Sequence, residues 1–129
     1  MSHGSPVDPP LVLIADDEPA VTRLLERALG AAGFRTHVVA DGAAALAWLA
    51  LETPGVVLLD IAMPKVDGRD VLSRVRADPR LGAVPVIMVS GRDDEYTRED
   101  VLKLGARELI AKPISAESVV RHVRRALDA

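Results

Sequence analysis

The sequence predicts an α/β fold in which a doubly wound parallel sheet of five strands is covered by five helices. Short runs that are apolar at every position recur along the chain, as is typical of strands buried on both faces. Segments with helical spacing of apolar residues separate these runs, and strict alternation with right-handed crossovers gives a parallel sheet. A length of 129 residues suits one such domain.

The strands are predicted from five short runs. They cover residues 11–15, 34–40, 56–59, 84–89 and 109–111. The second run mixes polar and apolar residues, which favours a more exposed strand. Pro85 has no N–H to donate, so we expect it at the start of the fourth strand.

The helices are predicted from apolar spacing, caps and stops. The first follows Pro19 and carries apolar residues at helical spacing, which we expect to face inward: Val21, Leu24, Leu25, Ala28, Leu29 and Ala32. The next three cover 43–51, 68–76 and 93–104, and the last follows Ser115. Asp41 and Ser115 are expected N-caps, and Gly33 and Gly105 are expected C-terminal stops.

Composition excludes several classes of function. The chain has no cysteine, so thiol catalysis, a disulfide scaffold and a cysteine-based metal site are excluded. It has three aromatic residues and a net charge of −3, which argues against direct nucleic-acid binding. No apolar segment is long enough to span a membrane, and residues 1–10 lack the basic start and apolar run of a signal peptide. We therefore expect a cytoplasmic protein. Residues 1–10 are expected to be a flexible segment before a domain at 11–128.

Charged and hydroxyl side chains follow four of the predicted strands. Asp16 and Asp17 end the first, Asp60 the third, Ser90 the fourth and Lys112 the fifth. Alone, each has an ordinary explanation as a helix cap, a turn residue or a solvated surface lysine. Ligands of such folds bind outside the carboxyl ends of the strands. The coincidence of all five residues there predicts a binding site.

The residue types predict phosphoryl chemistry at this site. Clustered carboxylates need a cation, and an all-oxygen site with room for water suits Mg²⁺. A lysine and a hydroxyl beside the metal can neutralise phosphoryl oxygens. Asp60 stands alone after a central strand, which makes it the best nucleophile for forming an aspartyl phosphate. The three histidines are scattered without ligand spacing.

The chain resembles the receiver domains of bacterial two-component response regulators, including the chemotaxis type. The resemblance covers residues 11–127 and rests on five motifs: LVLIADDEP at 11–19, LLDIAMP at 58–64 with Asp67-Gly68, VSG at 89–91, Gly105-Ala106, and AKP at 111–113. It implies a flavodoxin-like fold with strand order 2-1-3-4-5. These motifs contain the residues already singled out at the strand ends.

The resemblance implies a role for each site residue. Asp60 would accept a phosphoryl group from the phosphohistidine of a sensor kinase or phosphotransfer protein. Mg²⁺ would be bound by Asp17, Asp60 and the backbone carbonyl of Ala62, and by Asp16 largely through a water. Lys112 would contact the phosphoryl group. Such a chain would catalyse only its own phosphorylation and dephosphorylation, so we do not expect an enzyme with a separate substrate.

The resemblance also implies a conformational switch that controls a downstream protein or a linked output domain. Ser90 would swing toward the phosphate, and Lys112 would precede a cis peptide bond to Pro113. Many receivers carry Tyr or Phe three residues before the lysine and Phe after Lys-Pro; here Leu109 and Ile114 stand there. Coupling is therefore expected to rely on the fourth helix. The implied output face would carry charges: Asp94, Glu95, Arg98, Glu99, Arg121, His122, Arg124 and Arg125.

The resemblance also implies that the residues two positions after Asp60 and after Ser90 influence the lifetime of the phosphoryl group. Ala62 has no polar side chain to orient a water, and Arg92 could cover the site, so slow self-dephosphorylation is expected. Three other functions fit these residues less well. A Mg²⁺-dependent phosphohydrolase would need a second acid or base and a substrate pocket. FMN binding would need a phosphate-binding loop without acidic residues. A degenerate receiver would lack some of the five site residues.

Overall fold

Five parallel strands form the centre of the computed structural model, which describes residues 9–91 and 98–128. The strands are β1 (Leu11–Ala15), β2 (Arg35–Val39), β3 (Val56–Asp60), β4 (Val86–Ser90) and β5 (Glu108–Ala111). They pair in the order β2-β1-β3-β4-β5, which confirms the predicted topology. β3 and β4 are buried along their whole length, whereas β2 alternates between exposed and covered residues at the sheet edge.

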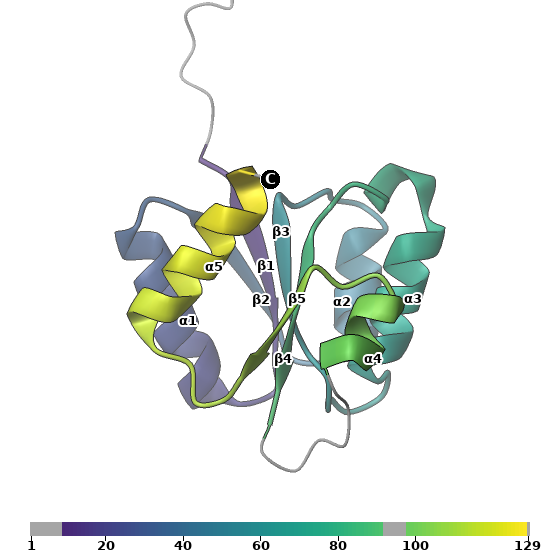
Figure 1. Cartoon of the computed structure of the whole chain (residues 1–129), viewed down its shortest axis with the longest axis horizontal. Helices are drawn as coiled ribbons and strands as arrows, with labels where there is room; N and C mark the ends of the chain where they lie inside the picture. The colour runs from purple at the N-terminus through teal and green to yellow at the C-terminus, as the bar shows by residue number, and fades with distance from the viewer. Residues whose placement is uncertain (1–8, 92–97, 129) are drawn as a thin grey trace, which may run out of the picture.

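Helices cover both faces of the sheet (Figure 1). They are α1 (Pro19–Ala31), α2 (Gly42–Leu49), α3 (Gly68–Ala77), α4 (Arg98–Lys103) and α5 (Ala116–Asp128), with a short 3₁₀ turn at Pro79–Leu81. Leu25 and Leu29 of α1 pack with Val119 and Val123 of α5 in one core layer. A second layer joins the opposite face of the sheet to α2, α3 and α4. Burial of both faces explains the continuous apolar strands.

Predicted caps and stops set the helix boundaries. The Asp41 carboxylate accepts a hydrogen bond from Ala44 N at 2.7 Å, and Ser115 Oγ accepts one from Ser118 N at 3.1 Å. Both contacts satisfy N–H groups that a helix start leaves unpaired. Gly33 and Gly105 adopt φ values of +96° and +106°, in the region that favours glycine. These four predictions are confirmed.

Two details of the predicted elements differ in the structure. Leu24 is 39% exposed, because the buried stripe of α1 passes through Thr22, Leu25 and Leu29. β4 begins one residue after Pro85, so the proline precedes the strand, although its carbonyl still accepts from Val57 N at 3.0 Å. Of the predicted fourth helix, α4 covers Arg98–Lys103, and the part before Arg98, with Tyr96, lies outside the described residues.

The described part of the chain begins at Pro9. The backbone oxygens of Pro9 and Pro10 accept hydrogen bonds from Arg35, at 2.8 Å and 3.0 Å. Flexibility of the segment before the domain stays a prediction, since residues 1–8 lie outside the description. Among the described helices, none combines the length and hydropathy that a membrane crossing requires.

Candidate functional site

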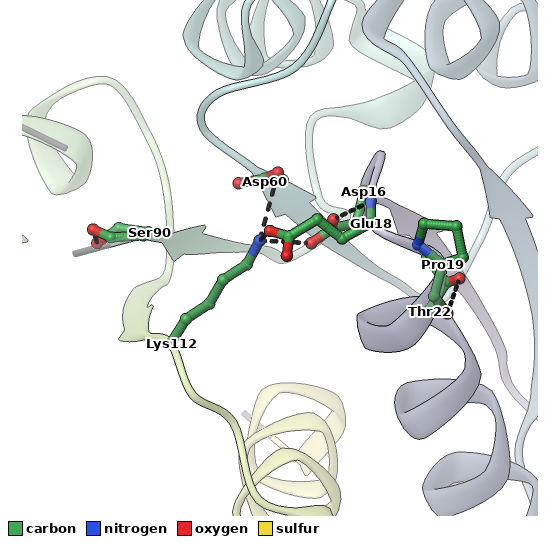
Figure 2. Close-up of polar contacts among 8 residues, drawn as sticks. Asp16, Glu18, Pro19, Thr22, Asp60, Ser90 and Lys112 are labelled. Carbon is green, nitrogen blue, oxygen red and sulfur yellow. Dashed lines mark hydrogen bonds and ion pairs between the residues drawn. The ribbon is translucent and has the colours of Figure 1, made fainter. Parts of the chain in front are cut away.

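Three strands bring an ammonium and two buried carboxylates together at one edge of the sheet (Figure 2). Asp16 follows β1, Asp60 ends β3, and Lys112 follows β5. Lys112 Nζ lies 3.1 Å from Asp16 Oδ2 and 3.6 Å from Asp60 Oδ2. Both carboxylates are 3% exposed. Their convergence at the carboxyl ends of the strands agrees with the position predicted from the sequence.

Glu18 belongs to the same cluster, and the sequence interpretation gave it no role. Its Oε1 lies 2.6 Å from Lys112 Nζ, the shortest of the three ion pairs that this lysine makes with described residues. Its backbone N–H donates to Asp16 Oδ1 at 2.9 Å, which fixes the turn between β1 and α1. The sequence does contain a signal that Glu18 belongs to the site, because this residue directly follows Asp16-Asp17 and precedes Pro19, where α1 begins.

A candidate metal centre lies in the turn after β1. Oxygen atoms of Asp16, Asp17 and Glu18 lie within 4.8 Å of one another. All three offer the hard oxygen ligands that Mg²⁺ and Ca²⁺ prefer. Asp17 is exposed, yet its charge also raises the pKa of Asp60, which indicates that the two carboxylates are close. The Ala62 N–H donates to the Asp60 carboxylate; metal binding by the Ala62 carbonyl stays a prediction.

The electrostatics of the cluster favour an added cation. Burial, followed by the charge of Asp16, raises the pKa of Asp60 to about 7, against the attraction of Lys112. Burial also raises the pKa of Asp16, although the Glu18 N–H and Lys112 oppose it. Among the described residues, the single ammonium of Lys112 therefore does not balance the negative charges of the cluster. An all-oxygen site with excess negative charge fits a divalent hard cation.

Lys112 remains charged in this environment. Burial alone would lower the pKa of its ammonium, but hydrogen bonds to Glu18 and Asp16 and the charge of Asp60 outweigh that effect and raise it. Its side chain is 15% exposed. Because the ammonium is both charged and partly shielded from water, it is able to donate strong hydrogen bonds to an anion beside Asp60.

Two glycines permit the close packing that positions Asp60. A Cβ on Gly68, the first residue of α3, would lie 2.2 Å from the Asp60 carbonyl oxygen. Gly68 N instead donates to the Ile61 carbonyl at 2.8 Å, which ties α3 to the end of β3. A Cβ on Gly42 would lie 2.0 Å from the Val66 carbonyl oxygen, in the loop between β3 and α3. Glycine at both positions lets this loop close beside the site.

Ser90 is linked to Lys112 through the backbone. The two residues end neighbouring strands, and Lys112 N donates to the Ser90 carbonyl at 2.8 Å. The Ser90 hydroxyl is nearly buried and donates to the Gly91 carbonyl at 3.4 Å. Figure 2 shows it apart from the carboxylate cluster. Of the five predicted site residues, Ser90 therefore lies at the same sheet edge without joining the ion pairs.

The other residues predicted for the switch surround the site. Leu109 is partly buried and packs against the core layer that contains α4. The Lys112-Pro113 peptide bond is cis, as expected. Pro113, Leu24, Glu18 and Lys112 line an open cavity of about 430 Å³ beside the cluster. The unexpected exposure of Leu24 places an apolar side chain there.

Charges on the predicted output face are partly paired. Glu108 of β5 lies 2.8 Å from His122 Nδ1 of α5 and 4.0 Å from the Arg98 guanidinium of α4. Glu99 pairs with Lys103 on α4 at 3.9 Å, while Arg121, Arg124 and Arg125 of α5 are exposed. Asp94 and Glu95 lie outside the described residues, as does Arg92, which was expected to cover the site.

The chain is similar to curated regulatory proteins. Sensory transduction protein RegX3 of Mycobacterium tuberculosis is 40% identical over 116 residues, which cover 90% of this chain and 50% of RegX3. Transcriptional regulatory protein TrcR of the same organism is 37% identical over 123 residues, covering 95% of this chain and 46% of TrcR. The chain spans about half the length of the curated relatives it matches.

Solved structures of receiver domains share the fold. The receiver domain of Francisella response regulator 1452 aligns with a TM-score of 0.84 at 28% identity, covering 92% of this chain and 97% of that one. The receiver domain of sensor histidine kinase PA1611 from Pseudomonas aeruginosa gives 0.85 at 26% identity over 94% and 99%, and holds a magnesium ion in its active site cleft. The family model of the response regulator receiver domain matches residues 12–124. The chain therefore belongs to the response regulator receiver domains of two-component systems.

Proposed function

We propose that Asp60 accepts a phosphoryl group from the phosphohistidine of a sensor kinase or phosphotransfer protein. The observation that carries this proposal is the position of the Asp60 carboxylate, buried at the end of β3 with the Lys112 ammonium 3.6 Å away. A carboxylate nucleophile beside a fixed cation is the arrangement that phosphoryl transfer to an aspartate requires.

The transfer is a single displacement at phosphorus. An Asp60 Oδ attacks the phosphorus and forms the new O–P bond, while the P–N bond to the donor imidazole breaks and its electron pair returns to the ring nitrogen. Lys112 donates to a phosphoryl oxygen and offsets its charge. Ser90 is the second donor, since its hydroxyl can leave the Gly91 carbonyl, to which it donates at 3.4 Å. The acylphosphate product adds charge next to β4 and β5 and so favours a second conformation.

We assign Mg²⁺ to the turn after β1. Asp16, Asp17, Asp60 and the Ala62 carbonyl would hold it, in keeping with the excess negative charge of the cluster. Bound there, the ion would offset charge on the phosphoryl oxygens during transfer. The chain's own contribution is to hold the oxygen atoms that would bind the ion at the ends of β1 and β3 before the phosphoryl donor arrives.

Added Mg²⁺ is expected to raise the melting temperature of the protein. A ligand that binds only the folded state at a hundred times its Kd stabilises it by about 2.7 kcal/mol. For a domain of this size, that is a shift of roughly 10 °C. Thermal unfolding with and without MgCl₂ measures it. Asp17→Asn should abolish most of the shift, Glu117→Gln on the exposed start of α5 should not, and equal shifts in both variants would contradict the assignment.

Partners and location follow from this function. The receiver would pass its state to a downstream protein or a linked output domain, and the regulatory relatives, about twice as long as this chain, make a linked domain a reasonable partner. α4, β5 and α5 form the face proposed for this contact. We propose a cytoplasmic location, where a kinase phosphohistidine is available, and no separate substrate beyond the phosphoryl donor.

The phosphoryl group is expected to persist on Asp60. Ala62 is exposed beside the site and offers no polar side chain to orient an attacking water. The double variant Ala62→Asn, Arg92→Glu supplies such groups and should lose the phosphoryl group roughly tenfold faster, which is less than the roughly 10²–10⁴-fold of a fully positioned acid or base. Decay followed after removal of the donor measures this. A parent protein that decays no more slowly than the variant would contradict the expectation.

The proposal is tested by incubating the protein with acetyl phosphate and MgCl₂. Intact-mass measurement should show the addition of one phosphoryl group to the parent and none to Asp60→Asn. Circular dichroism of the variant confirms that it is folded. Absence of addition to the parent, or equal addition to the variant, would overturn the assignment of Asp60.

A further inference from the structure

The Lys112 ammonium is engaged before any phosphoryl group arrives. It lies 2.6 Å from Glu18 Oε1, 3.1 Å from Asp16 Oδ2 and 3.6 Å from Asp60 Oδ2 (Figure 2). A lysine ammonium has three hydrogens to donate. Glu18 and Asp16 are within hydrogen-bond distance, whereas Asp60 at 3.6 Å forms an ion pair only, so a phosphoryl oxygen on Asp60 draws the ammonium toward itself against its contacts to Glu18 and Asp16.

The three carboxylates differ in how readily they can move away from the ammonium. Asp16 and Asp60 have side chains that are 3% and 4% exposed and are held at strand ends. The Glu18 side chain is 58% exposed, at the edge of the cavity beside Lys112. Its backbone is fixed by the hydrogen bond to Asp16, so its side chain can turn into solvent without moving the turn. Exposed ion pairs contribute little net free energy. Glu18 is therefore the acceptor that is easiest to displace.

We propose that Glu18 is a positioning residue whose carboxylate competes with the phosphoryl group for the Lys112 ammonium. This inference rests on the proposed phosphorylation of Asp60. In the unmodified protein, Glu18 holds the lysine charge toward the mouth of the site. When an Asp60 Oδ forms its bond to phosphorus and the donor bond breaks, the ammonium exchanges Glu18 for a phosphoryl oxygen. Glu18 thus slows phosphorylation and favours the unmodified state.

A different role would have the opposite effect. Glu18 oxygens also lie within 4.8 Å of those of Asp16 and Asp17. If Glu18 were mainly a metal ligand, neutralising it would weaken Mg²⁺ binding and slow phosphorylation. If it competes for Lys112, neutralising it leaves Mg²⁺ affinity nearly unchanged and accelerates phosphorylation. The two roles therefore predict opposite signs.

Three variants separate contact from charge. Glu18→Gln removes the charge at the same length, and Glu18→Asp keeps the charge but shortens the side chain and breaks the 2.6 Å contact. Glu26→Gln is the matched control, because it makes the same charge change on an exposed position of α1. The probes are acetyl phosphate at saturating MgCl₂ for the phosphorylation rate, and calorimetric titration with MgCl₂ for metal affinity. Side-chain NMR of the lysine ammonium groups in the metal-free protein reports the contact itself.

The expected result is a roughly two- to fivefold faster phosphorylation of Glu18→Gln, the size that one exposed ion pair supports. Glu18→Asp should show part of this gain, Glu26→Gln none, and the Lys112 ammonium signal should shift in both Glu18 variants only. An unchanged or slower rate in Glu18→Gln, or a gain shared by Glu26→Gln, would overturn the inference. A parent protein that takes up no phosphoryl group would instead overturn the proposed function, and the NMR shift would still report the ion pair.

Discussion

Asp60→Asn is expected to be more stable than the parent protein at pH 8 in the absence of divalent cations. The pKa of Asp60 rises from 3.8 to about 7 in the folded state, mainly through burial and then through the charge of Asp16. The folded protein thus binds this proton more tightly than the unfolded chain, and stability falls as the pH rises from about 4 through about 7. At about 1.4 kcal/mol per pKa unit, the ionised carboxylate costs the fold on the order of 2–4 kcal/mol.

Chemical denaturation at two pH values measures this effect. The variant should exceed the parent by about 2–4 kcal/mol at pH 8, and most of the difference should disappear at pH 5, where the parent carboxyl is protonated. Asp70→Asn makes the same change on an exposed position of α3 and should give no such gain. Equal stability of Asp60→Asn and parent at pH 8 would show that the buried carboxylate carries no such cost. The variant removes the phosphoryl acceptor. A gain in its free energy of unfolding would therefore indicate that the site lowers the stability of the protein in favour of its function.

Gly68→Ala is expected to damage both the fold and the site. Its Cβ would lie 2.2 Å from the Asp60 carbonyl oxygen and 2.9 Å from Ile61 Cα, which are backbone atoms that cannot rotate away. Overpacking of this kind typically costs about 1–3 kcal/mol. The α3 start and the end of β3 must separate, so the Asp60 carboxylate shifts relative to Lys112. A misplacement of about 1 Å can cost roughly a hundredfold in rate.

Gly30→Ala provides the matched control. Gly30 lies in α1, and a Cβ there meets nothing within 4 Å. Alanine at such a helical position should stabilise the protein by about 0.5–1 kcal/mol. The two substitutions should therefore shift the melting temperature in opposite directions. Only Gly68→Ala should slow phosphorylation by acetyl phosphate. Normal phosphorylation of a folded Gly68→Ala variant would show that the close approach of α3 is not needed at the site.

Much of the fold could be predicted because each element carries its own local signal. Short apolar runs identified four of the strands, and the mixed run at 34–40 identified the more exposed edge strand β2. Asp41, Ser115, Gly33 and Gly105 marked helix ends through backbone chemistry that acts within a few residues. Leu24 was misjudged because helical spacing gives the direction of a side chain but not the width of the surface that covers it. That width depends on where β5 and α5 pass, which is tertiary information.

The site could be predicted to the level of strand ends but not of contacts. The topology alone places Asp16, Asp60 and Lys112 at one edge. The Lys112 to Glu18 pair was missed, because residues 94 positions apart meet only through the pairing of strands. The reason for glycine at position 68 was also hidden, since the Asp60 carbonyl that excludes a side chain comes from another element. The separation of Ser90 from the cluster depends on a side-chain rotation that no spacing encodes.

The central claim is that Asp60 itself carries the phosphoryl group, and locating the modified residue tests it most directly. After reaction with acetyl phosphate and MgCl₂, borohydride reduces an aspartyl phosphate to homoserine, which tandem mass spectrometry of peptides can place in the chain. The account predicts homoserine at position 60, dependent on both the donor and MgCl₂, and at no other aspartate. Homoserine at position 16 or 17 instead, or an unmodified residue 60 after the protein has gained the mass of a phosphoryl group, would contradict it.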